Sequence, residues 1–178
     1  MQLADGGTLK NQIGKHPSAA IVTAWMRDVA SAFEYIHGMR VYHRDVKLEN
    51  LLVLNGRVLV ADFGLAAIVS SSIAPNRQTQ AGTANYASPE KVRGREGYNS
   101  KADMWALGCV LVELASDKRL WRPVWDDGSE AEAVREELVG NAARASPVLG
   151  DVARKLLLLD PRERISAFEM RFLLHKGC

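Results

Sequence analysis

The clearest hydrophobic pattern in the chain is an amphipathic stripe over residues 18–38. Its apolar positions follow the i, i+3, i+4, i+7 spacing of one helix face, and they are Val22, Trp25, Met26, Val29, Phe33 and Ile36. Gly38 stands at the end of the stripe as a stop signal. We therefore predict a long helix here, which leads directly into the polar segment that begins at residue 43.

A second apolar run covers residues 104–115, in which Glu113 is the one charged residue. A helix that is apolar on all sides is buried, and this run is too short to cross a bilayer. Ser100 and Asp103 precede the run with a spacing like that of a capping box. The pattern therefore predicts a buried helix that starts at Ser100.

Two short apolar runs flank the dipeptide Asn55-Gly56. Residues 51–54 read Leu-Leu-Val-Leu, and residues 57–61 read Arg-Val-Leu-Val-Ala. Asn-Gly between such runs is typical of a β-hairpin, because both residues tolerate the positive φ of a type I′ turn. The hairpin would place residues 50 and 62 side by side at its open end. Taken alone, the stretch indicates only an ordinary hairpin with acidic ends.

The rest of the chain is less regular. Residues 62–90 are largely polar and aperiodic, with many turn formers between residues 69 and 80, which predicts a mobile loop. Residues 121–128 form an aromatic-rich loop whose tryptophans suit packing, the favoured interpretation, or a protein docking surface. Ser129, followed by acidic residues in the first turn, predicts a short helix that runs to Gly140.

The composition narrows the class of protein. With 178 residues, 47% of them hydrophobic, the chain is long enough for one packed domain. Its net charge of +2 provides no basic surface for nucleic acid, and it contains no signal peptide, membrane-spanning run or repeat. Cys109 and Cys178 suggest no disulfide framework, which fits a reducing compartment. We expect a cytoplasmic protein, with the nucleus as the alternative location. We also expect that it binds neither nucleic acid nor membrane.

The candidate chemistry lies in two motifs on either side of the predicted hairpin. Residues 43–50 read His-Arg-Asp-Val-Lys-Leu-Glu-Asn, and residues 62–64 read Asp-Phe-Gly. Two carboxylates, an amide and a lysine at these spacings can hold a Mg²⁺-nucleotide and pass a phosphoryl group to a hydroxyl. Such a transfer depends on positioning and charge neutralisation rather than on covalent help from the protein.

These motifs resemble those of the eukaryotic protein kinases, and the resemblance extends over residues 1–178. It implies the C-terminal lobe of the kinase fold, mainly α with a small β-hairpin, and no N-terminal lobe. Residues 43–50 would form the catalytic loop and residues 62–90 the activation segment. Lys47, two residues after Asp45, resembles the serine/threonine class. The implied activity is transfer of the γ-phosphoryl group of ATP to Ser or Thr of a protein substrate.

The resemblance gives each polar residue of these motifs a role. Asp45 accepts the proton of the attacking hydroxyl, and Lys47 places a positive charge at the moving phosphate. Asn50 and Asp62 supply oxygen ligands to Mg²⁺. The residues implied to bind the nucleotide are Lys47 and Asp62, Leu52 beneath the adenine ring, and the backbone of Gln2 and Ala4 at the adenine edge.

In the activation segment the resemblance implies two threonines with different roles. Thr83 joins the catalytic set by bonding to side chains of the catalytic loop. Thr79 would carry an activating phosphate, added by another kinase and bound by Arg44. The family often supplies a second basic residue at the position of Ala67, so Arg44 would bind the phosphate less firmly. The serines at 70–72 are equally open as modification sites.

Five further residues hold the motifs in place in the resemblance. The ring of His43 packs against Phe63, and Asp103 bonds to the backbone of the catalytic loop. Glu90 and Arg164 form a buried ion pair that ties the activation segment to the base of the lobe.

Two further residues, one of them inside the first motif, have more than one interpretation. His37 fits a hydrogen-bonded structural histidine better than a metal ligand, because no second ligand stands at helical spacing. Glu49 hints at basic residues near the phosphoacceptor, but a solvated glutamate explains it as well.

The start of the chain resembles the hinge between the two kinase lobes. The three features that the family carries before the hinge are therefore missing: the glycine-rich loop, the strand lysine and the helix glutamate. An apolar surface should then be exposed where the small lobe sits. The favoured interpretation is a fragment of a serine/threonine kinase, because the catalytic set is intact. The alternative is a non-catalytic scaffold or decoy that binds protein partners. A Mg²⁺-dependent hydrolase using Asp45 and Asp62 is remote, since it leaves Thr83, Glu90, Asp103 and Arg164 unexplained.

Overall fold

The computed structural model describes residues 5–68, 84–92, 100–120 and 131–176. In these parts the longer helices are α1 (Ala19–Gly38), α3 (Ser100–Ser116), α4 (Ala131–Ala145), α5 (Pro147–Leu156) and α6 (Ala167–Lys176). The strands are β1 (Val41–Tyr42), β2 (Leu51–Leu54), β3 (Arg57–Val60) and β4 (Ala67–Ile68). The short helical turns are η1 (Leu9–Gln12), η2 (Leu48–Asn50), η3 (Phe63–Leu65), η4 (Ala84–Tyr86) and α2 (Pro89–Val92).

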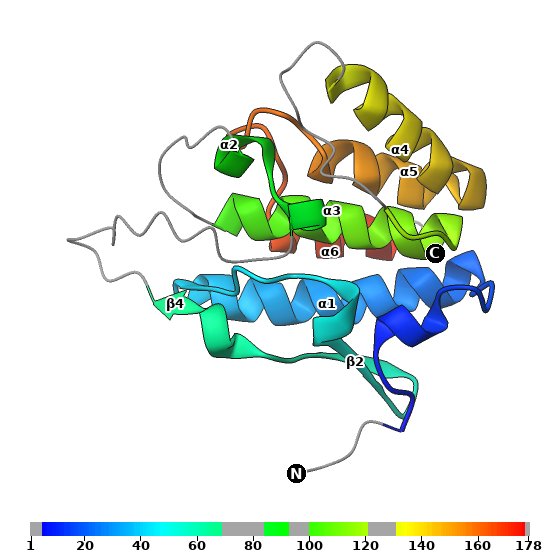
Figure 1. The fold of residues 1–178 in the computed structure, drawn as a ribbon, viewed down its shortest axis with the longest axis horizontal. Helices are drawn as coiled ribbons and strands as arrows, with labels where there is room; N and C mark the ends of the chain where they lie inside the picture. The colour runs from blue at the N-terminus through cyan, green and yellow to red at the C-terminus, as the bar shows by residue number, and fades with distance from the viewer. Residues whose placement is uncertain (1–4, 69–83, 93–99, 121–130, 177–178) are drawn as a thin grey trace.

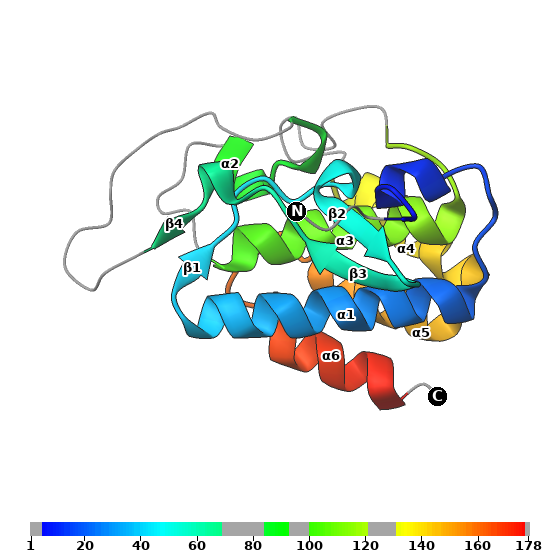
Figure 2. The same cartoon turned by 90° about the horizontal axis from the view of Figure 1, so that it is seen from below.

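The two longest helices, α1 and α3, lie at the centre of the molecule (Figure 1). α4 and α5 pack against each other and against α3. Figure 2 shows the β2–β3 hairpin on one side of α1 and α6 on the other, and both contact α1. The fold is mainly α-helical with a small hairpin, as the sequence predicts.

The helix predicted over residues 18–38 is present as α1. Ser18 caps it, because its hydroxyl accepts a hydrogen bond from the Ile21 N–H at 3.3 Å. The predicted stripe faces the core, and its fully buried members are Val22, Met26, Val29 and Phe33. Burying one such side chain stabilises the fold by about 1.5–3 kcal/mol relative to leaving it in water, so this face fixes how α1 sits.

α3 is buried on all sides, as its uniformly apolar sequence predicts. A Cβ on Gly108 would stand 2.7 Å from Leu157 Cδ2, so glycine is needed where α3 meets the residue after α5. Burial raises the pKa of the Cys109 thiol, which lies in the middle of α3. A thiol held in its neutral form is a poor nucleophile, so Cys109 is a packing residue.

The predicted hairpin is present, with β2 and β3 paired antiparallel. Asn55 and Gly56 have φ angles of 50° and 76°, the positive values that a type I′ turn requires. Trp25 of α1 donates from Nε1 to the Gly56 carbonyl at 3.2 Å. Asp28, one turn further along α1, accepts a hydrogen bond from the Val58 N–H at 3.0 Å. These bonds fix the hairpin to α1.

Two predictions, one of a helix end and one of a loop, are wrong. The helix predicted to stop at Gly140 continues as α4 to Ala145, because Val139 and Ala142 pack into the core and a glycine inside a helix costs only about 1 kcal/mol. Its proposed cap, Ser129, lies outside the described residues. The segment 62–90 is not loop throughout, since β4 pairs with β1, residues 84–86 form a helical turn and α2 begins at Pro89. The pairing of β4 joins positions distant in sequence, which local composition does not reveal.

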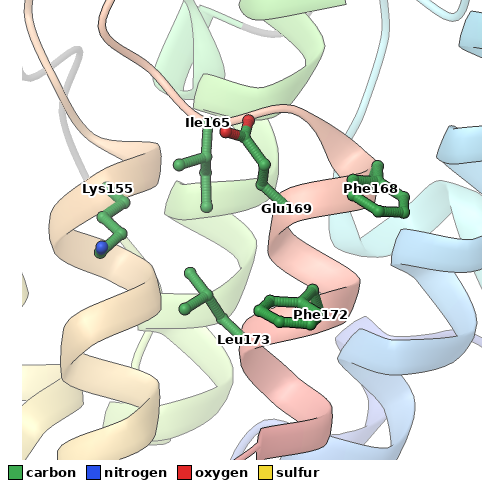
Figure 3. A pocket seen from close by; sticks show the side chains of 6 residues that line it. All are labelled: Lys155, Ile165, Phe168, Glu169, Phe172 and Leu173. Carbon is green, nitrogen blue, oxygen red and sulfur yellow. The ribbon is translucent and has the colours of Figure 1, made fainter.

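α6 begins with a capping box. The Glu169 carboxylate accepts a hydrogen bond from the Ser166 N–H at 2.7 Å, and the Ser166 hydroxyl accepts one from the Glu169 N–H at 3.3 Å. A groove of about 370 Å³ between α5 and α6 is lined by Lys155, Ile165, Phe168, Glu169, Phe172 and Leu173 (Figure 3). Among the described helices, none has the length and hydropathy needed to cross a membrane.

Candidate active site

Asp103 on α3 holds the backbone of the catalytic loop. Its carboxylate accepts hydrogen bonds from the N–H groups of His43 and Arg44, both at 3.0 Å. His37, near the end of α1, donates from Nε2 to the same carboxylate at 2.9 Å. Asp103 is fully buried, so these donors replace the water that its charge would otherwise require. The contact expected for Asp103 is present, and His37 is a hydrogen-bonded structural histidine.

His43 links the catalytic loop to the end of the hairpin. Its Nε2 donates to the Ala61 carbonyl at 2.9 Å, and its Nδ1 accepts a hydrogen bond from the Asp45 N–H at 3.3 Å. Together these bonds require the tautomer with hydrogen on Nε2. The ring centroid lies 5.0 Å from that of Phe63, so the expected packing is present. The ring is buried and also lies 6.0 Å from the ring of Phe33 in α1.

Asp45, Lys47 and Asn50 form one hydrogen-bonded group. Lys47 Nζ lies 2.6 Å from Asp45 Oδ2 in a charge-assisted hydrogen bond. Asn50 Nδ2 donates to the Asp45 carbonyl at 2.8 Å and to its Oδ2 at 3.2 Å. Asp45 and Asn50 are each 7% exposed. Three chemically distinct groups are therefore held together at one edge of the core.

The hairpin brings Asp62 to this group. The Ala61 N–H donates to the Asn50 carbonyl at 2.9 Å, so Asp62 follows directly from a residue bonded to Asn50. Asp62 has a φ of 63°, a left-handed conformation that aspartate tolerates better than most residues. Its exposed carboxylate accepts a hydrogen bond from the Gly64 N–H at 3.3 Å. The predicted proximity of residues 50 and 62 is present.

The side-chain oxygens of Asn50 and Asp62 are suitable ligands for Mg²⁺. Both hydrogen bonds of the Asn50 side chain use Nδ2, and the opposite atom, the amide oxygen, is the one that binds hard cations. Asp62 adds an exposed carboxylate. Within the residues that the structure describes, no group of three or more acidic, His or Cys side chains gathers to hold a metal. Mg²⁺ ordinarily keeps water and phosphate ligands beside one or two protein oxygens, so the donor set fits.

Glu90 and Arg164 form the ion pair that the resemblance implies. The contact is bidentate, with Nη1 to Oε1 at 2.9 Å and Nη2 to Oε2 at 3.1 Å. The Arg164 side chain is completely buried, and its guanidinium lies 4.9 Å from the ring centroid of Trp105. Arg164 also donates to the Leu158 carbonyl. The pair therefore ties α2, at the end of the activation segment, to the core.

Of the residues assigned to adenine binding, the structure describes Leu52. It forms an isolated bridge with Thr8, and next to it the Val53 N–H donates to the Gly7 carbonyl at 2.8 Å. The segment that follows the predicted hinge thus lies along β2. Gln2, Ala4, Thr79 and Thr83 lie outside the described residues, so their assignments stay predictions.

Two basic residues near the catalytic loop were not found from the sequence. Burial lowers the pKa of Lys91, and the charge of Asp45 works in the opposite direction. Arg119, just after α3, makes an ion pair with Glu49 of the loop at 3.2 Å. Neither position belongs to a motif, and the contact between Arg119 and Glu49 joins segments distant in sequence.

The site and fold together define a protein kinase lobe, and comparison with other proteins agrees. The family described as protein kinase domain matches residues 1–173. The chain therefore belongs to the eukaryotic protein kinase family, and its relatives place it in the serine/threonine group.

Three curated relatives illustrate the similarity. The mouse serine/threonine-protein kinase Nek1 is 31% identical over 99% of this chain and 15% of its own length. The zebrafish serine/threonine-protein kinase Nek8 is 33% identical over 92% of this chain and 24% of its own length. Aurora/IPL1-related protein kinase 2 of Caenorhabditis briggsae is 31% identical over 96% of this chain and 56% of its own length. The chain thus spans at most about half the length of these relatives.

Proposed function

We propose that this chain carries the acceptor-binding and Mg²⁺-binding half of a serine/threonine protein kinase active site. The observation that carries the proposal is the bonded group of Asp45, Lys47 and Asn50, joined through the hairpin to Asp62. The substrates are ATP and a Ser or Thr hydroxyl of a protein. The product pair is a phosphorylated protein and ADP.

Each residue has one task in the proposed reaction. Asp45 accepts a hydrogen bond from the acceptor hydroxyl and takes its proton as the oxygen attacks the γ-phosphorus. The ammonium group of Lys47, which bonds to Asp45 in the structure, also interacts with the phosphoryl oxygens and neutralises part of their negative charge. Asn50 and Asp62 would hold Mg²⁺, which would supply neutralisation of the charge on the phosphates. Thr83 helps to align the acceptor, and Thr79 together with Arg44 provides regulation by an activating kinase.

The nucleotide is proposed to lie between Leu52 and a second lobe. Kinase chemistry also requires a lysine and glutamate pair on the small lobe. Phe63, Leu65 and Ile68 are 44%, 42% and 74% exposed, and they provide an apolar surface of the kind expected where that lobe docks. These exposed side chains also favour one second candidate, a kinase-like scaffold that binds protein partners without catalysis.

The test compares variants of the longest natural form of the protein that contains these residues. Asp45→Ala should abolish phosphoryl transfer to a protein substrate while leaving Mg²⁺-ATP binding intact, because Asp45 touches the acceptor. Asp62→Asn should instead weaken Mg²⁺-dependent nucleotide binding at least tenfold. Asp151→Ala, on the exposed face of α5, is the matched control for both.

Radioactive phosphate transfer and nucleotide binding by calorimetry separate these outcomes. Loss of both transfer and binding in Asp45→Ala would contradict the role given to Asp45. Absence of transfer by the wild-type protein under conditions that bind Mg²⁺-ATP would favour the scaffold.

A further inference from the structure

Glu49 of the catalytic loop belongs to a cluster of side chains that the proposed reaction does not use. We call it the Glu49 cluster, and its members are Lys10, Glu49, Tyr86, Glu113 and Arg119. They come from η1, η2, η4, α3 and the residues just after α3. The sequence left open whether Glu49 attracts basic residues of a substrate or is simply solvated. The structure agrees with neither, since the Glu49 side chain is 31% exposed and is paired within the chain.

Two cations of the same chain contact Glu49. Lys10 Nζ and Arg119 Nη2 each lie 3.2 Å from Glu49 Oε1. Partial burial works to raise the pKa of Glu49, but hydrogen bonds from its own backbone and from Lys10, with the charge of Arg119, outweigh it, and the pKa lies below its ordinary value. Glu49 is therefore negatively charged at neutral pH, and the positive charges of Lys10 and Arg119 already balance that charge.

Arg119 also forms an ion pair with a second carboxylate, that of Glu113. Its Nε lies 3.4 Å from Glu113 Oε1, and the Glu113 side chain is 1% exposed. Glu113 accepts further hydrogen bonds from the Tyr86 hydroxyl at 2.6 Å and the Leu120 N–H at 2.8 Å. A buried carboxylate needs both hydrogen bonds and a countercharge, and Arg119 supplies the latter. Arg119 thus bridges an acid of the core and an acid of the catalytic loop.

The cluster lies beside the acceptor-binding residues. Glu49 directly precedes Asn50, whose side chain bonds to Asp45. Solvent reaches the cluster, because the side chains of Arg119 and Lys10 are 24% and 55% exposed. Two acids and two bases face one another here. A basic residue of a bound peptide would therefore meet no net negative charge and would have to displace the Arg119 guanidinium.

We propose that Arg119 is a specificity-determining residue, whose guanidinium fills the acidic pocket formed by Glu49 and Glu113 and prevents a basic substrate residue from binding there. This inference rests on the proposed kinase function for its meaning. The wild type should phosphorylate basic and neutral peptides about equally well. Without Arg119, the protein should phosphorylate basic peptides more efficiently.

The experiment uses the longest natural form of the protein and peptides in which arginine or norleucine is scanned through positions flanking the acceptor serine. The wild type should differ by less than about threefold in kcat/KM between the paired peptides. Arg119→Met should prefer arginine about tenfold at one position, the size of one charge-assisted hydrogen bond. The added Glu49→Gln change should remove that preference. Arg154→Met, at an exposed arginine of α5, is the matched control and should behave as the wild type.

A second measurement separates this inference from the proposed function. Fluorescence anisotropy of the same labelled peptides reports binding without transfer, so a wild type that phosphorylates nothing would contradict the kinase proposal alone. If Arg119→Met fails to fold because Glu113 loses its countercharge, a variant that combines Arg119→Met, Glu113→Gln and Lys10→Met leaves Glu49 without a partner cation and tests the same pocket. A tenfold arginine preference in the wild type, or none in these variants, would overturn the inference.

Discussion

The catalytic loop and the segment of residues 62–68 meet at the same site but are held in different ways. In the loop, Asp45 and Asn50 are 7% exposed and bonded to each other, and Asp103 holds the backbone from beneath. In the second segment Asp62 is exposed, and the apolar side chain of Ile68 is 74% exposed. The first region is built on the core of this chain, whereas the second presents its side chains outward.

The difference shows how the two halves of the proposed site depend on their surroundings. Burial and satisfied hydrogen bonds fix Asp45 and Asn50 without any further contact. Residues 62–68 have an exposed apolar surface that gains stability only when something covers it. Four substitutions can break or sharpen this contrast, and in order of decreasing effect on stability they are Asp103→Ala, Phe33→Ala, Phe63→Ala and Asp62→Asn.

Replacing Asp103 should have the largest effect. Asp103→Ala leaves the N–H groups of His43 and Arg44 without their acceptor inside the core, and we expect a loss of about 3–5 kcal/mol in the free energy of unfolding. Urea unfolding measures it, and hydrogen exchange at the two amides should accelerate. Asp151→Ala, at an exposed helical position, should change stability by less than about 0.5 kcal/mol. Equal effects at the two positions would contradict the role of Asp103.

The two phenylalanines around His43 test the contrast directly. Phe33 is fully buried, and Phe63 is 44% exposed. We expect Phe33→Ala to cost about 3–5 kcal/mol and Phe63→Ala only about 1 kcal/mol, because less apolar surface leaves water at the second position. Thermal or urea denaturation of both variants gives the comparison. Similar losses would show that residues 62–68 are as firmly held as the core.

Asp62→Asn should barely change stability, by less than about 0.5 kcal/mol, since its side chain is exposed and asparagine also tolerates positive φ. Mg²⁺-dependent nucleotide binding should fall in the same protein. A stability loss above about 2 kcal/mol would mean that the Asp62 carboxylate is structural.

Ser166→Ala tests a region far from the contrast and should cost about 1 kcal/mol through loss of the α6 cap. Hydrogen bonds from the Ser166 backbone and hydroxyl hold the pKa of Glu169 below its ordinary value. A carboxyl with a depressed pKa stabilises the fold above its unfolded pKa and loses that contribution as pH falls. The cost of Ser166→Ala, measured by urea unfolding, should therefore be larger at pH 7 than near pH 3. A cost independent of pH would contradict the capping box.

The parts predicted from the sequence depend on neighbouring positions. The stripe over residues 18–38 and the Asn55-Gly56 turn each specify an element through local periodicity or permitted φ angles. The catalytic motif places Asp45 and Asn50 five residues apart, and the turn between them is short enough that their bonding follows. The Glu90–Arg164 pair is distant in sequence, and it was expected only because the whole pattern resembles a known family.

What the sequence determined by itself is therefore the chemistry of the two motifs and the helices and hairpin that hold them. Tertiary structure decided the rest: the continuation of α4 past Gly140, the donation from His37 to Asp103, and the pairing of Glu49 with Lys10 and Arg119. The physical reason is that burial and ion pairing depend on which distant segments pack together. Glu49 looks the same in the sequence whether it faces solvent, a substrate or an internal arginine, and only the fold distinguishes them.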